Sequence, residues 1–434
     1  MFKLKIIFYW IRFNLRGIFR DRATLVKFQE KHLKQFYKNI LPKAPFYTDL
    51  IKSNIKLQDF PLMNKNLFME NFELLNTQNI SKSKALETAL RAENERNFSP
   101  QINKVTVGLS TGTSGKRGIF LVSENERAQW AAMVMTRVIK PKLWKKQKVA
   151  FFLRANSNLY SSVQSALFEF RYFDIFQPIE QLAKGLNDFQ PHVLAAQPSI
   201  LCHLAEFQQK NFIDVNPVTV VSFAEVLYPE DKTFICSVFK NNFKEVYQCT
   251  EGFLGITCEH GTMHLNEDLF LLEKKWLDEK RFHPILTDFT RSTQPIVRYE
   301  LDDILVESRT PCLCGSCFTA LERIEGRTND IFLFKTNDGE IVKIYPDLLA
   351  RRIAQKTDDF RAYKVRQLSY TELEVGLDTD AVRYAEVCTQ LNEALDLFLR
   401  ERNLENIKIR FENKIPHIAG SKLRKFERAF TDEN

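Results

Sequence analysis

The sequence predicts an α/β protein with a large, multi-layer N-terminal domain, which includes a β-rich subdomain, and a small α+β C-terminal domain. Strand-like and helix-like segments alternate over residues 149–249, which is typical of a layered α/β sheet. A β-rich stretch follows at 263–307. Beyond a change of pattern near residue 327, strands and helices mix over a length that suits a small domain. We therefore predict domains at 1–327 and 328–434.

The composition narrows the function classes. The chain has 434 residues, of which 44% are hydrophobic and 27% charged, so it can form a sizeable core and is neither collagen-like nor disordered. Its 37 Phe residues predict a Phe-rich core or an aromatic-lined pocket. The net charge is +8, and residues 1–43 carry eleven Lys or Arg and two acids. The rest of the chain is therefore nearly neutral, and we expect no nucleic-acid binding.

The basic N-terminal segment has two interpretations. Its longest apolar run, Ile6 to Ile11, is far shorter than the ~20 residues of a membrane span. Arg12 and Arg16 interrupt the apolar pattern, which argues against a signal peptide and makes the cytoplasm the expected location. Apolar and basic residues interleave at helical spacing. We favour a helix packed on the main body with its charges in water; the alternative is peripheral contact of residues 1–20 with an anionic membrane.

The remaining helices and strands are predicted from the period of the hydrophobic residues and from the positions of the prolines. Residues 24–75 are predicted to form helices and loops, which prolines separate. Further helices are expected at 124–140, 159–171, 199–211, 229–239, 346–356 and 380–399. Strands are expected at 105–109, 118–122, 149–153, 193–196, 218–223, 245–249, 331–335, 340–344, 363–368 and 372–376.

A glycine-rich loop is predicted between the strands at 105–109 and 118–122. The chain has only 14 glycines, yet four of them lie within residues 108–118. Unhindered N–H groups, hydroxyls and a lysine suit a polyphosphate, and they favour phosphate binding over a merely flexible hairpin. The loop is not a Walker A motif, because a serine stands where that motif needs its first glycine. The candidate phosphate-binding residues are Ser110, Thr111, Gly112, Thr113, Ser114, Gly115 and Lys116.

This loop resembles the phosphate loop of the adenylate-forming enzymes, and other motifs of that superfamily follow in the same order. Tyr247-Gln-Cys-Thr-Glu251 resembles the family's Tyr-Gly-x-Thr-Glu, with Gln248 in place of glycine. It lies at the end of an expected strand, where ligands bind in open α/β sheets. The resemblance implies that Tyr247 flanks the adenine of ATP, that Thr250 contacts phosphate, and that Glu251 helps to hold Mg²⁺.

Two further segments resemble nucleotide-binding motifs of the family. Ser222-Phe-Ala-Glu resembles the segment that lines the adenine pocket in phenylacetate-CoA ligase-like members, which implicates Ala224 and Glu225. Arg298-Tyr-Glu-Leu-Asp-Asp-Ile resembles the family's Arg-Tyr-x-Thr-Gly-Asp-Ile. The resemblance implies that Asp303 binds the ribose hydroxyls. Leu301 and Asp302 depart from the family's Thr-Gly.

The family's C-terminal elements are also recognisable. Arg323-Ile-Glu-Gly-Arg resembles the domain junction and implies that Arg327 contacts the nucleotide. Asn329 stands where the family has its acidic hinge residue, about which a small mobile domain rotates. In the closing Gly-Ser-Lys segment, Lys422 aligns with the lysine that reaches the reacting carboxylate and the α-phosphate. Lys425 is the alternative.

The cysteines predict a structural zinc site. Three of the eight cysteines lie in Cys-Leu-Cys-Gly-Ser-Cys, and Cys-Glu-His-Gly-Thr-Met-His lies upstream. Cys and His at such short spacing in two loops suit tetrahedral Zn²⁺, whereas the alternative is a group of reduced, buried thiols. The pattern resembles the zinc site of phenylacetate-CoA ligase-like proteins. We assign Cys258, His264, Cys312 and Cys314, with Cys317 or His260 as substitutes.

The resemblance spans residues 105–425 and is nearest to the phenylacetate-CoA ligase and coenzyme-F synthetase branch. It implies an ATP- and Mg²⁺-dependent ligase that converts a carboxylic acid, expected to be aromatic, to acyl-AMP and passes it to the thiol of coenzyme A or of an acyl carrier protein. One alternative is adenylylation of a hydroxyl, as in coenzyme-F synthetases. The other is a non-catalytic zinc-bearing homologue, against which the retained Lys116, Glu251, Asp303 and Lys422 argue.

Overall fold

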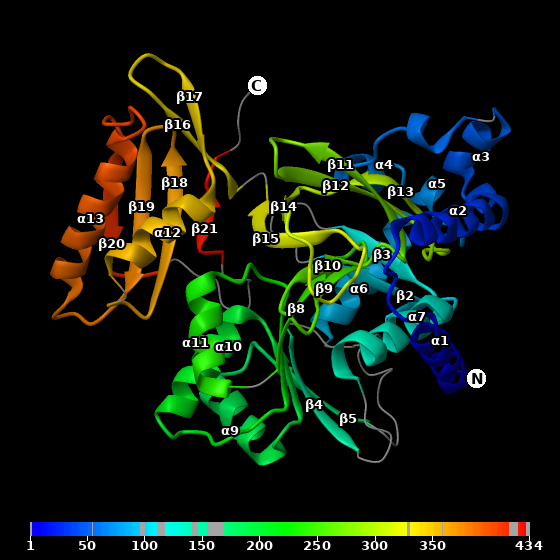
Figure 1. Ribbon diagram of the computed structural model, residues 1–434, viewed down its shortest axis with the longest axis horizontal. Helices are drawn as coiled ribbons and strands as arrows, with labels where there is room; N and C mark the ends of the chain where they lie inside the picture. The colour runs from blue at the N-terminus through cyan, green and yellow to red at the C-terminus, as the bar shows by residue number, and fades with distance from the viewer. Residues whose placement is uncertain are drawn as a thin grey trace. The chain divides into compact units, whose positions relative to one another are not determined.

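The computed structural model describes two compact units, each of which mixes helices and strands (Figure 1). The described residues are 2–53, 55–95, 100–110, 118–140, 146–153, 168–240, 242–327, 330–357, 359–415 and 424–430. The first unit comprises Met1–Ala224, Thr233–Leu301 and Val306–Arg323, and the second Glu225–Lys232, Asp302–Leu305 and Ile324–Asn434. One large mixed sheet and a small C-terminal sheet confirm the predicted α/β fold class.

Helices dominate the described part of the first hundred residues, as the sequence predicts for the N-terminal segment and for 24–75. They are α1 (Phe2–Arg16), α2 (Arg22–Asn39), α3 (Pro45–Lys52), α4 (Lys65–Glu70), α5 (Phe72–Leu75) and α6 (Lys82–Asn94), with 3-10 turns at Leu41–Lys43 and Leu57–Asp59. Helix α2 begins after Asp21 because that carboxylate accepts a hydrogen bond of 2.7 Å from the amide of Thr24, the usual role of an N-cap. Within the described residues, no helix has both the length and the apolar character needed to cross a bilayer.

A three-stranded antiparallel sheet follows. It contains β1 (Gln101–Ile102), β2 (Val105–Leu109) and β3 (Ile119–Val122). Helix α7 (Glu124–Met133) then begins with a capping box between Ser123 and Glu126, which satisfies two otherwise unpaired amides. The same helix continues as a π-helical turn over Val134–Ile139. The predicted helix at 124–140 is thus present, although its last turn is wider than an α-helix.

The largest sheet has twelve strands, and one half of it is parallel. In spatial order the parallel strands are β8 (Asn242–Gln248), β7 (Thr219–Phe223), β6 (Val193–Ala196), β4 (Gln147–Leu153) and β5 (Phe168–Asp174). Parallel neighbours need crossover connections. Helices α9 (Ile179–Phe189), α10 (Pro198–Gln209) and α11 (Pro229–Phe239) connect β5 to β6, β6 to β7 and β7 to β8. The connection from β4 to β5 lies outside the described residues.

The other half of this sheet extends from β8 and contains the predicted β-rich stretch. Its strands are β9 (Phe253–Thr257), β10 (Met263–Leu265), β11 (Phe270–Trp276), β12 (Arg281–Asp288), β13 (Ile296–Glu300), β14 (Asp303–Glu307) and β15 (Ala320–Arg327). From β8 outward the order is β9, β10, β15, β14, β12 and β11, and β13 pairs with β12 off this path. The strands that flank the Ser222–Glu225, Tyr247–Glu251 and Arg298–Asp303 segments are therefore held in one continuous sheet, whereas those around the glycine-rich loop form the separate three-stranded sheet.

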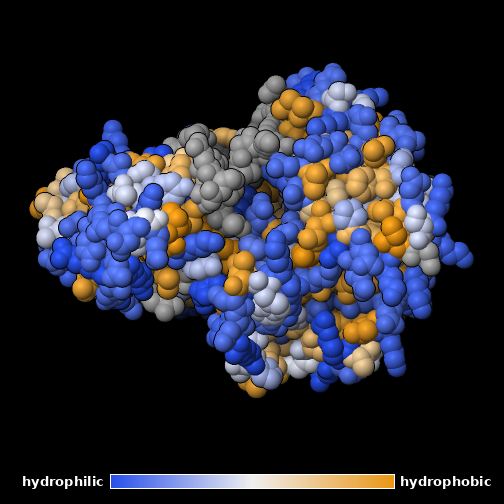
Figure 2. Space-filling view, turned by 90° about the horizontal axis from the view of Figure 1, so that it is seen from above, coloured by the Kyte–Doolittle hydropathy of each residue, from blue (hydrophilic) through white to orange (hydrophobic). Residues whose placement is uncertain are grey.

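Phenylalanine forms much of the core. Among the twelve largest side chains that are essentially inaccessible to solvent, ten are Phe. Phe152 and Phe173 stack with their ring centroids 4.6 Å apart, as do Phe151 and Phe223 at 4.9 Å. On the face drawn in Figure 2, by contrast, hydrophilic residues cover most of the surface and apolar residues lie in small scattered groups. The Phe-rich composition is therefore explained by the core.

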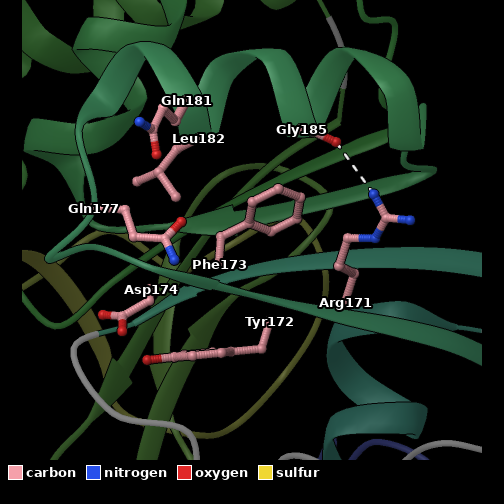
Figure 3. A pocket seen from close by; sticks show the side chains of 8 residues that line it. All are labelled: Arg171, Tyr172, Phe173, Asp174, Gln177, Gln181, Leu182 and Gly185. Carbon is pink, nitrogen blue, oxygen red and sulfur yellow. Dashed lines mark hydrogen bonds between the residues drawn. The ribbon is translucent and has the colours of Figure 1, made fainter.

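The prediction of a helix over 159–171 is wrong for its described part. Residues 168–171 belong to β5, and residues 159–167 lie outside the described residues. Apolar and charged residues alternate in Phe-Glu-Phe-Arg, which is the period of a strand. Strand β5 and helix α9 line a cavity of about 500 Å³ that is edged by Tyr172, Phe173 and Gln177 (Figure 3). None of the predicted site residues lines this cavity.

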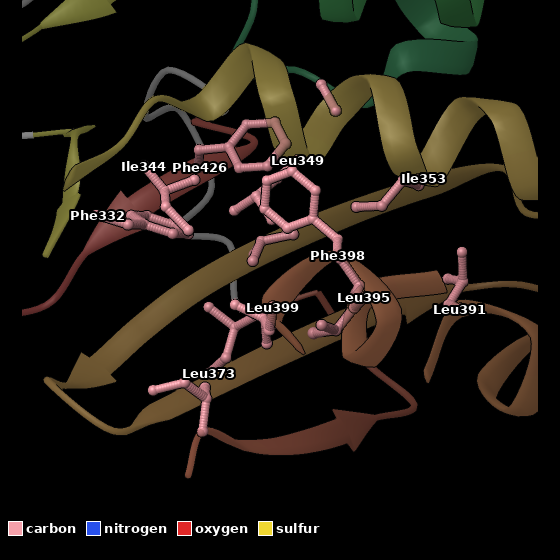
Figure 4. Close-up of a cluster of buried hydrophobic side chains, with 14 of the residues drawn as sticks. Phe332, Ile344, Leu349, Ile353, Leu373, Leu391, Leu395, Phe398, Leu399 and Phe426 are labelled. Carbon is pink, nitrogen blue, oxygen red and sulfur yellow. The ribbon is translucent and has the colours of Figure 1, made fainter. Parts of the chain in front are cut away.

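The second unit has its own core. A hairpin of β16 (Phe332–Lys335) and β17 (Ile341–Ile344) precedes α12 (Pro346–Lys356). A four-stranded sheet, in the order β20 (Lys408–Glu412), β19 (Glu372–Asp378), β18 (Ala362–Ser369) and β21 (Phe426–Arg428), packs with α13 (Tyr384–Arg400). Figure 4 shows the buried cluster that these elements enclose, to which Leu349, Leu395 and Phe426 belong. Such a core is what an independent small domain requires.

Candidate functional site

The glycine-rich loop begins and ends in a paired hairpin. Strands β2 and β3 run antiparallel up to Leu109 and Ile119. Beyond them the amide of Ser110 donates to the carbonyl of Gly118 at 2.8 Å, and the amide of Gly118 donates to Ser110 Oγ at 2.7 Å. Both predicted flanking strands are therefore confirmed. The candidate residues inside the loop, Thr111, Gly112, Thr113, Ser114, Gly115 and Lys116, lie outside the described residues, and their phosphate-binding role stays a prediction.

The chain turns sharply where β7 ends. Ala224 has a φ of +71°, a left-handed conformation that is uncommon for a residue other than glycine, Asn or Asp. It separates Phe223, the last residue of β7, from Glu225. Backbone strain of this kind clusters at ligand-binding sites. The two residues predicted to line an adenine pocket therefore lie in an abrupt turn at the carboxyl end of a parallel strand.

The Tyr-Gln-Cys-Thr-Glu motif forms the turn between β8 and β9. Tyr247 is buried near the end of β8, and a register shift between Tyr247 and Gln248 marks the start of the turn. The turn is closed by the amide of Cys249, which donates to the carbonyl of Gly252 at 3.1 Å. Thr250 and Glu251 thus lie at its tip, partly exposed.

Gln248, which stands where the adenylate-forming enzymes have a glycine, has a hydrogen-bond partner on helix α7. The indole N–H of Trp130 donates to Gln248 Oε1 at 3.3 Å. The glutamine side chain therefore pairs with helix α7, and the turn that carries Thr250 and Glu251 is formed without the family's glycine.

A buried carboxyl group that the sequence analysis did not single out lies beside this turn. Asp288, at the end of β12, is 7% exposed, and a Cβ added to Gly252 would lie 3.5 Å from its Oδ2. Its Oδ1 accepts from the amide and the hydroxyl of Thr290 at 2.8 and 2.6 Å. Burial raises the pKa of Asp288 to about 6, against these hydrogen bonds. The local signal was an Asp-x-Thr turn at a strand end.

Asp303 and Arg327 contact each other in the second unit. Arg327 Nε lies 3.4 Å from Asp303 Oδ1, and the amide of Arg327 donates to Asp330 Oδ2 at 3.2 Å. Asp330 also pairs with Arg424. The side chains of Asp303 and Arg327 are therefore oriented by each other's opposite charge. The hinge candidate Asn329 lies outside the described residues.

Of the two candidate lysines near the C-terminus, only Lys425 is described. Its Nζ lies 2.8 Å from Asp231 Oδ2 and 3.7 Å from Glu230 Oε1. It also lies over the rings of Tyr228 and Tyr363, at 4.9 and 5.1 Å from their centroids. An ammonium group held by two carboxylates and two rings is a structural cation of the second unit. Lys422 lies outside the described residues, and its catalytic role stays a prediction.

The four predicted zinc ligands come together in the first unit. The ligand atoms of Cys258, His264, Cys312 and Cys314 all lie within 4.8 Å of one another. The sulfurs of Cys258 and Cys312 are 3.6 Å apart, and Cys314 Sγ is 3.4 Å from His264 Nε2. A tetrahedral Zn²⁺ with bonds of about 2.0–2.3 Å requires ligand atoms about 3.5–3.8 Å apart. The donor set and its spacing therefore fit zinc.

The surrounding backbone orients these ligands. His264 Nδ1 lies 3.3 Å from the carbonyl of Phe318; donation there leaves the Nε2 lone pair for a metal, the usual second partner of a zinc-binding histidine. Each cysteine loop is a tight turn whose fourth residue is a glycine at positive φ, Gly261 at +75° and Gly315 at +72°. Glycine adopts this conformation without steric cost.

The two alternative ligands are not part of the cluster. The backbone amide of His260 donates to Cys258 Sγ at 3.4 Å, and the amide of Cys317 donates to the carbonyl of Phe19 at 2.9 Å. Neither side chain joins the four-ligand group within the described residues.

The pKa of Cys312 is lowered within the cluster. Burial alone would raise it, but hydrogen bonds from Thr262 and from the Cys314 amide outweigh burial and lower the pKa to about 6. A lowered pKa favours the thiolate that a metal binds.

Comparisons with known proteins identify the fold. No protein-family model matches the chain. It is 24% identical over 347 residues to Protein CapK of Staphylococcus aureus, across 75% of this chain and 72% of that protein. A 2-hydroxyisobutyryl-CoA ligase in its postadenylation state with 2-HIB-AMP superposes on 93% of this chain and 88% of its own, with a TM-score of 0.63 and 16% identity. An open conformation of that ligase, with 2-HIB-AMP and CoA, superposes on 91% of this chain and 89% of its own, with a TM-score of 0.53 and 17% identity.

A more distant solved structure has the same fold. The anthranilate CoA ligase AuaEII with anthranoyl-AMP superposes on 74% of this chain and 66% of its own, with a TM-score of 0.54 and 10% identity. The chain therefore has the fold of ligases that hold acyl-adenylates.

Metal removal tests the cysteine cluster. We expect purified protein to contain stoichiometric zinc and a chelator to lower its unfolding temperature by several degrees, because the metal ties two loops together in the folded state. Cys312→Ser should lose most of the zinc, whereas Cys388→Ser, in the second unit, should retain it. Elemental analysis and thermal unfolding measure both. Equal zinc in Cys312→Ser and the unmodified protein would contradict the assignment.

Asp288 predicts a pH dependence of stability. Its folded pKa of about 6 lies above the ordinary value of 3.8, so the native state holds the proton more tightly than the unfolded chain. This contribution is fully present below pH ~4 and is lost as the pH rises through ~6. The Asp288→Asn variant keeps the acceptor for Thr290 without the charge. We expect it to be more stable than the unmodified protein at about pH 8, by at most ~3 kcal/mol, and to lose most of this advantage at about pH 4.

Thermal unfolding at the two pH values measures the effect, and the exposed Asp338→Asn serves as the matched control. A pH-independent difference between Asp288→Asn and the unmodified protein would show that Asp288 titrates as an ordinary exposed carboxyl.

Proposed function

We propose that this protein is an adenylate-forming ligase, which uses ATP to convert a carboxylic acid to acyl-AMP and then passes the acyl group to a thiol. The observation that carries the proposal is the coincidence of fold and motif. The chain shares its fold over 93% of its length with a ligase that holds an acyl-adenylate. Its own Thr250 and Glu251 lie at the tip of a turn that ends the parallel run of strands, where α/β sheets bind ligands.

The resemblance assigns a role to each residue. The loop from Ser110 to Lys116 binds the β- and γ-phosphates, Thr250 the α-phosphate, and Asp303 the ribose hydroxyls. The remaining nucleotide contacts come from Ala224, Glu225, Tyr247 and Arg327. Glu251, a carboxylate on a partly exposed turn, is a ligand of the type that Mg²⁺ prefers. That ion would neutralise charge on the phosphates.

The proposed reaction has two steps. A carboxylate oxygen of the substrate attacks the α-phosphorus of ATP, the bond to the β-phosphate oxygen breaks, and pyrophosphate leaves. The Lys422 ammonium offsets the negative charge that develops on the α-phosphate, so the protein contributes mainly position and electrostatics. In the second step a thiol sulfur attacks the acyl carbon, AMP leaves with its phosphate oxygen, and the thiol proton passes to solvent. We propose that the small C-terminal domain, bounded near residue 327, rotates about residue 329 between these steps.

The acid and the acceptor are narrower proposals. We propose coenzyme A or a carrier-protein thiol as the acceptor, by analogy with the ligase that holds 2-HIB-AMP and CoA. The proposal that the acid is aromatic rests on the resemblance to the phenylacetate-CoA ligase branch. The high Phe content no longer supports it, because the buried core accounts for that content.

ATP–pyrophosphate exchange tests the proposal. With a panel of aromatic and aliphatic acids, we expect acid-dependent exchange with at least one acid. We also expect Lys422→Ala to reduce that exchange about a hundredfold or more, since removing one preorganised charge from a transition state costs about this much. The matched control is Lys414→Ala, an exposed lysine eight residues upstream, which should exchange at the normal rate.

Three outcomes would overturn parts of this proposal. Exchange that survives in Lys422→Ala removes the role of that lysine. Adenylylation of a hydroxyl compound in place of an acid points to chemistry like that of the coenzyme-F synthetases. A folded protein with neither exchange nor ATP binding is a non-catalytic homologue.

A further inference from the structure

Helix α1 packs on the first unit by one face only. Ile6 is buried, Lys5 Nζ pairs with Glu124 Oε1 at 2.8 Å, and the Tyr9 hydroxyl donates to Asn125 Oδ1 at 3.0 Å. Figure 1 shows α1, the first helix of the chain, alongside α7. The helix is thus fixed to the body through its inner face, as we favoured from the sequence.

The outer face of α1 is also apolar, which the packed-helix interpretation did not anticipate. Five large side chains point to solvent with 47% to 83% of their surface exposed: Leu4, Ile7, Phe8, Ile11 and Leu15. At 3.6 residues per turn these five fall on one side of the helix, opposite Ile6. A continuous exposed apolar stripe, unlike scattered single residues, marks an interaction site.

Basic residues border this stripe. Lys3 and Arg12 are exposed and lie just beyond the apolar residues on either side of the helix, and α1 contains no acidic residue. The next helix adds four exposed lysines at helical spacing, so that they share one face of α2: Lys27, Lys31, Lys34 and Lys38. An apolar stripe with a cationic border is the pattern of a helix that lies in a membrane interface.

We propose that the outer face of α1 docks the protein on an anionic lipid surface. The helix has 15 residues, about 22 Å, so it lies in the interface and does not span the bilayer. The apolar stripe enters the boundary between headgroups and acyl chains, while Lys3 and Arg12 reach the lipid phosphates. The inner face stays on α7, so the whole first unit is brought to the membrane.

Charge favours lipid over a second copy of the chain as the occupant. A two-fold dimer brings the same patch against itself, so Lys3 and Arg12 of one copy would approach those of the other across an apolar contact. Like charges at the edge of such an interface repel and destabilise it. An anionic bilayer offers the opposite sign over the whole length of the stripe.

Co-sedimentation of the full-length protein with lipid vesicles tests this. We expect binding to vesicles of phosphatidylcholine mixed with phosphatidylglycerol, weaker binding to phosphatidylcholine alone, and loss of the difference at high salt. The triple variant Leu4→Ser, Phe8→Ser, Leu15→Ser should partition at least about tenfold more weakly. The double variant Lys3→Glu, Arg12→Glu should lose about tenfold or more on the anionic vesicles only.

The matched control changes three exposed apolar residues elsewhere: Val218→Ser, Val382→Ser, Leu397→Ser. It should bind vesicles as the unmodified protein does. All variants should keep the unmodified protein's unfolding temperature and its exchange activity without vesicles, which separates this proposal from the proposed reaction. Unmodified protein that stays in the supernatant with anionic vesicles would overturn the proposal, as would a triple variant that binds normally. A dimer that the triple variant converts to a monomer, without vesicle binding, would assign the stripe to a second copy.

Discussion

Two buried carboxylates, Glu267 and Asp268, determine how the N-terminal region is attached. They lie in the turn between β10 and β11 and are 0% and 1% exposed. An isolated charge at such a depth costs several kcal/mol unless it is paired and hydrogen-bonded. Asp268 pairs with Arg16 at the end of α1 and with Arg137 at 2.6 Å, and Glu267 pairs with Arg22 at 2.7 Å. The turn can therefore be buried only while the helices that supply these arginines are in place.

The same turn connects the N-terminal helices to the metal-ligand cluster. The amide of Thr319, which follows the cysteine loop, donates to Glu267, and the amide of Cys317 donates to Phe19 between α1 and α2. A metal that holds Cys312 and Cys314 against Cys258 would thus also hold the segment that carries Cys317. We infer a structural role for the cluster on this ground, because its four ligands leave no open position for a substrate and because its neighbours are the contacts that attach α1.

The features that could be predicted from the sequence are those formed by residues close together in the chain. The strands around the glycine loop, and the strand that ends in the Tyr247 motif, could be predicted because the residues of each are adjacent in the chain. The four predicted metal ligands could be grouped because short Cys/His spacings are themselves a signal, and the structure brings their ligand atoms together. The Asp-x-Thr turn is a local signal for Asp288 but not for its burial, which places Asp288 beside Gly252, a residue distant in the chain. The pairing of Arg16 with Asp268 likewise joins distant residues and could not be predicted. The helix expected at 159–171 is wrong over residues 168–171, because Phe-Glu-Phe-Arg alternates with the period of a strand.

Helix α1 shows why two interpretations of one segment need not exclude each other. A packed helix and a membrane-surface helix exclude each other only where the helix has one apolar face, which can contact one partner. Here Ile6 lies on one side, and Leu4, Phe8 and Leu15 on the other, so 15 residues supply two apolar faces. An apolar pattern all round a helix normally indicates complete burial. In α1 the ion pair of Lys5 with Glu124 and that of Arg16 with Asp268 fix which face is inward, and the opposite face is left for a partner.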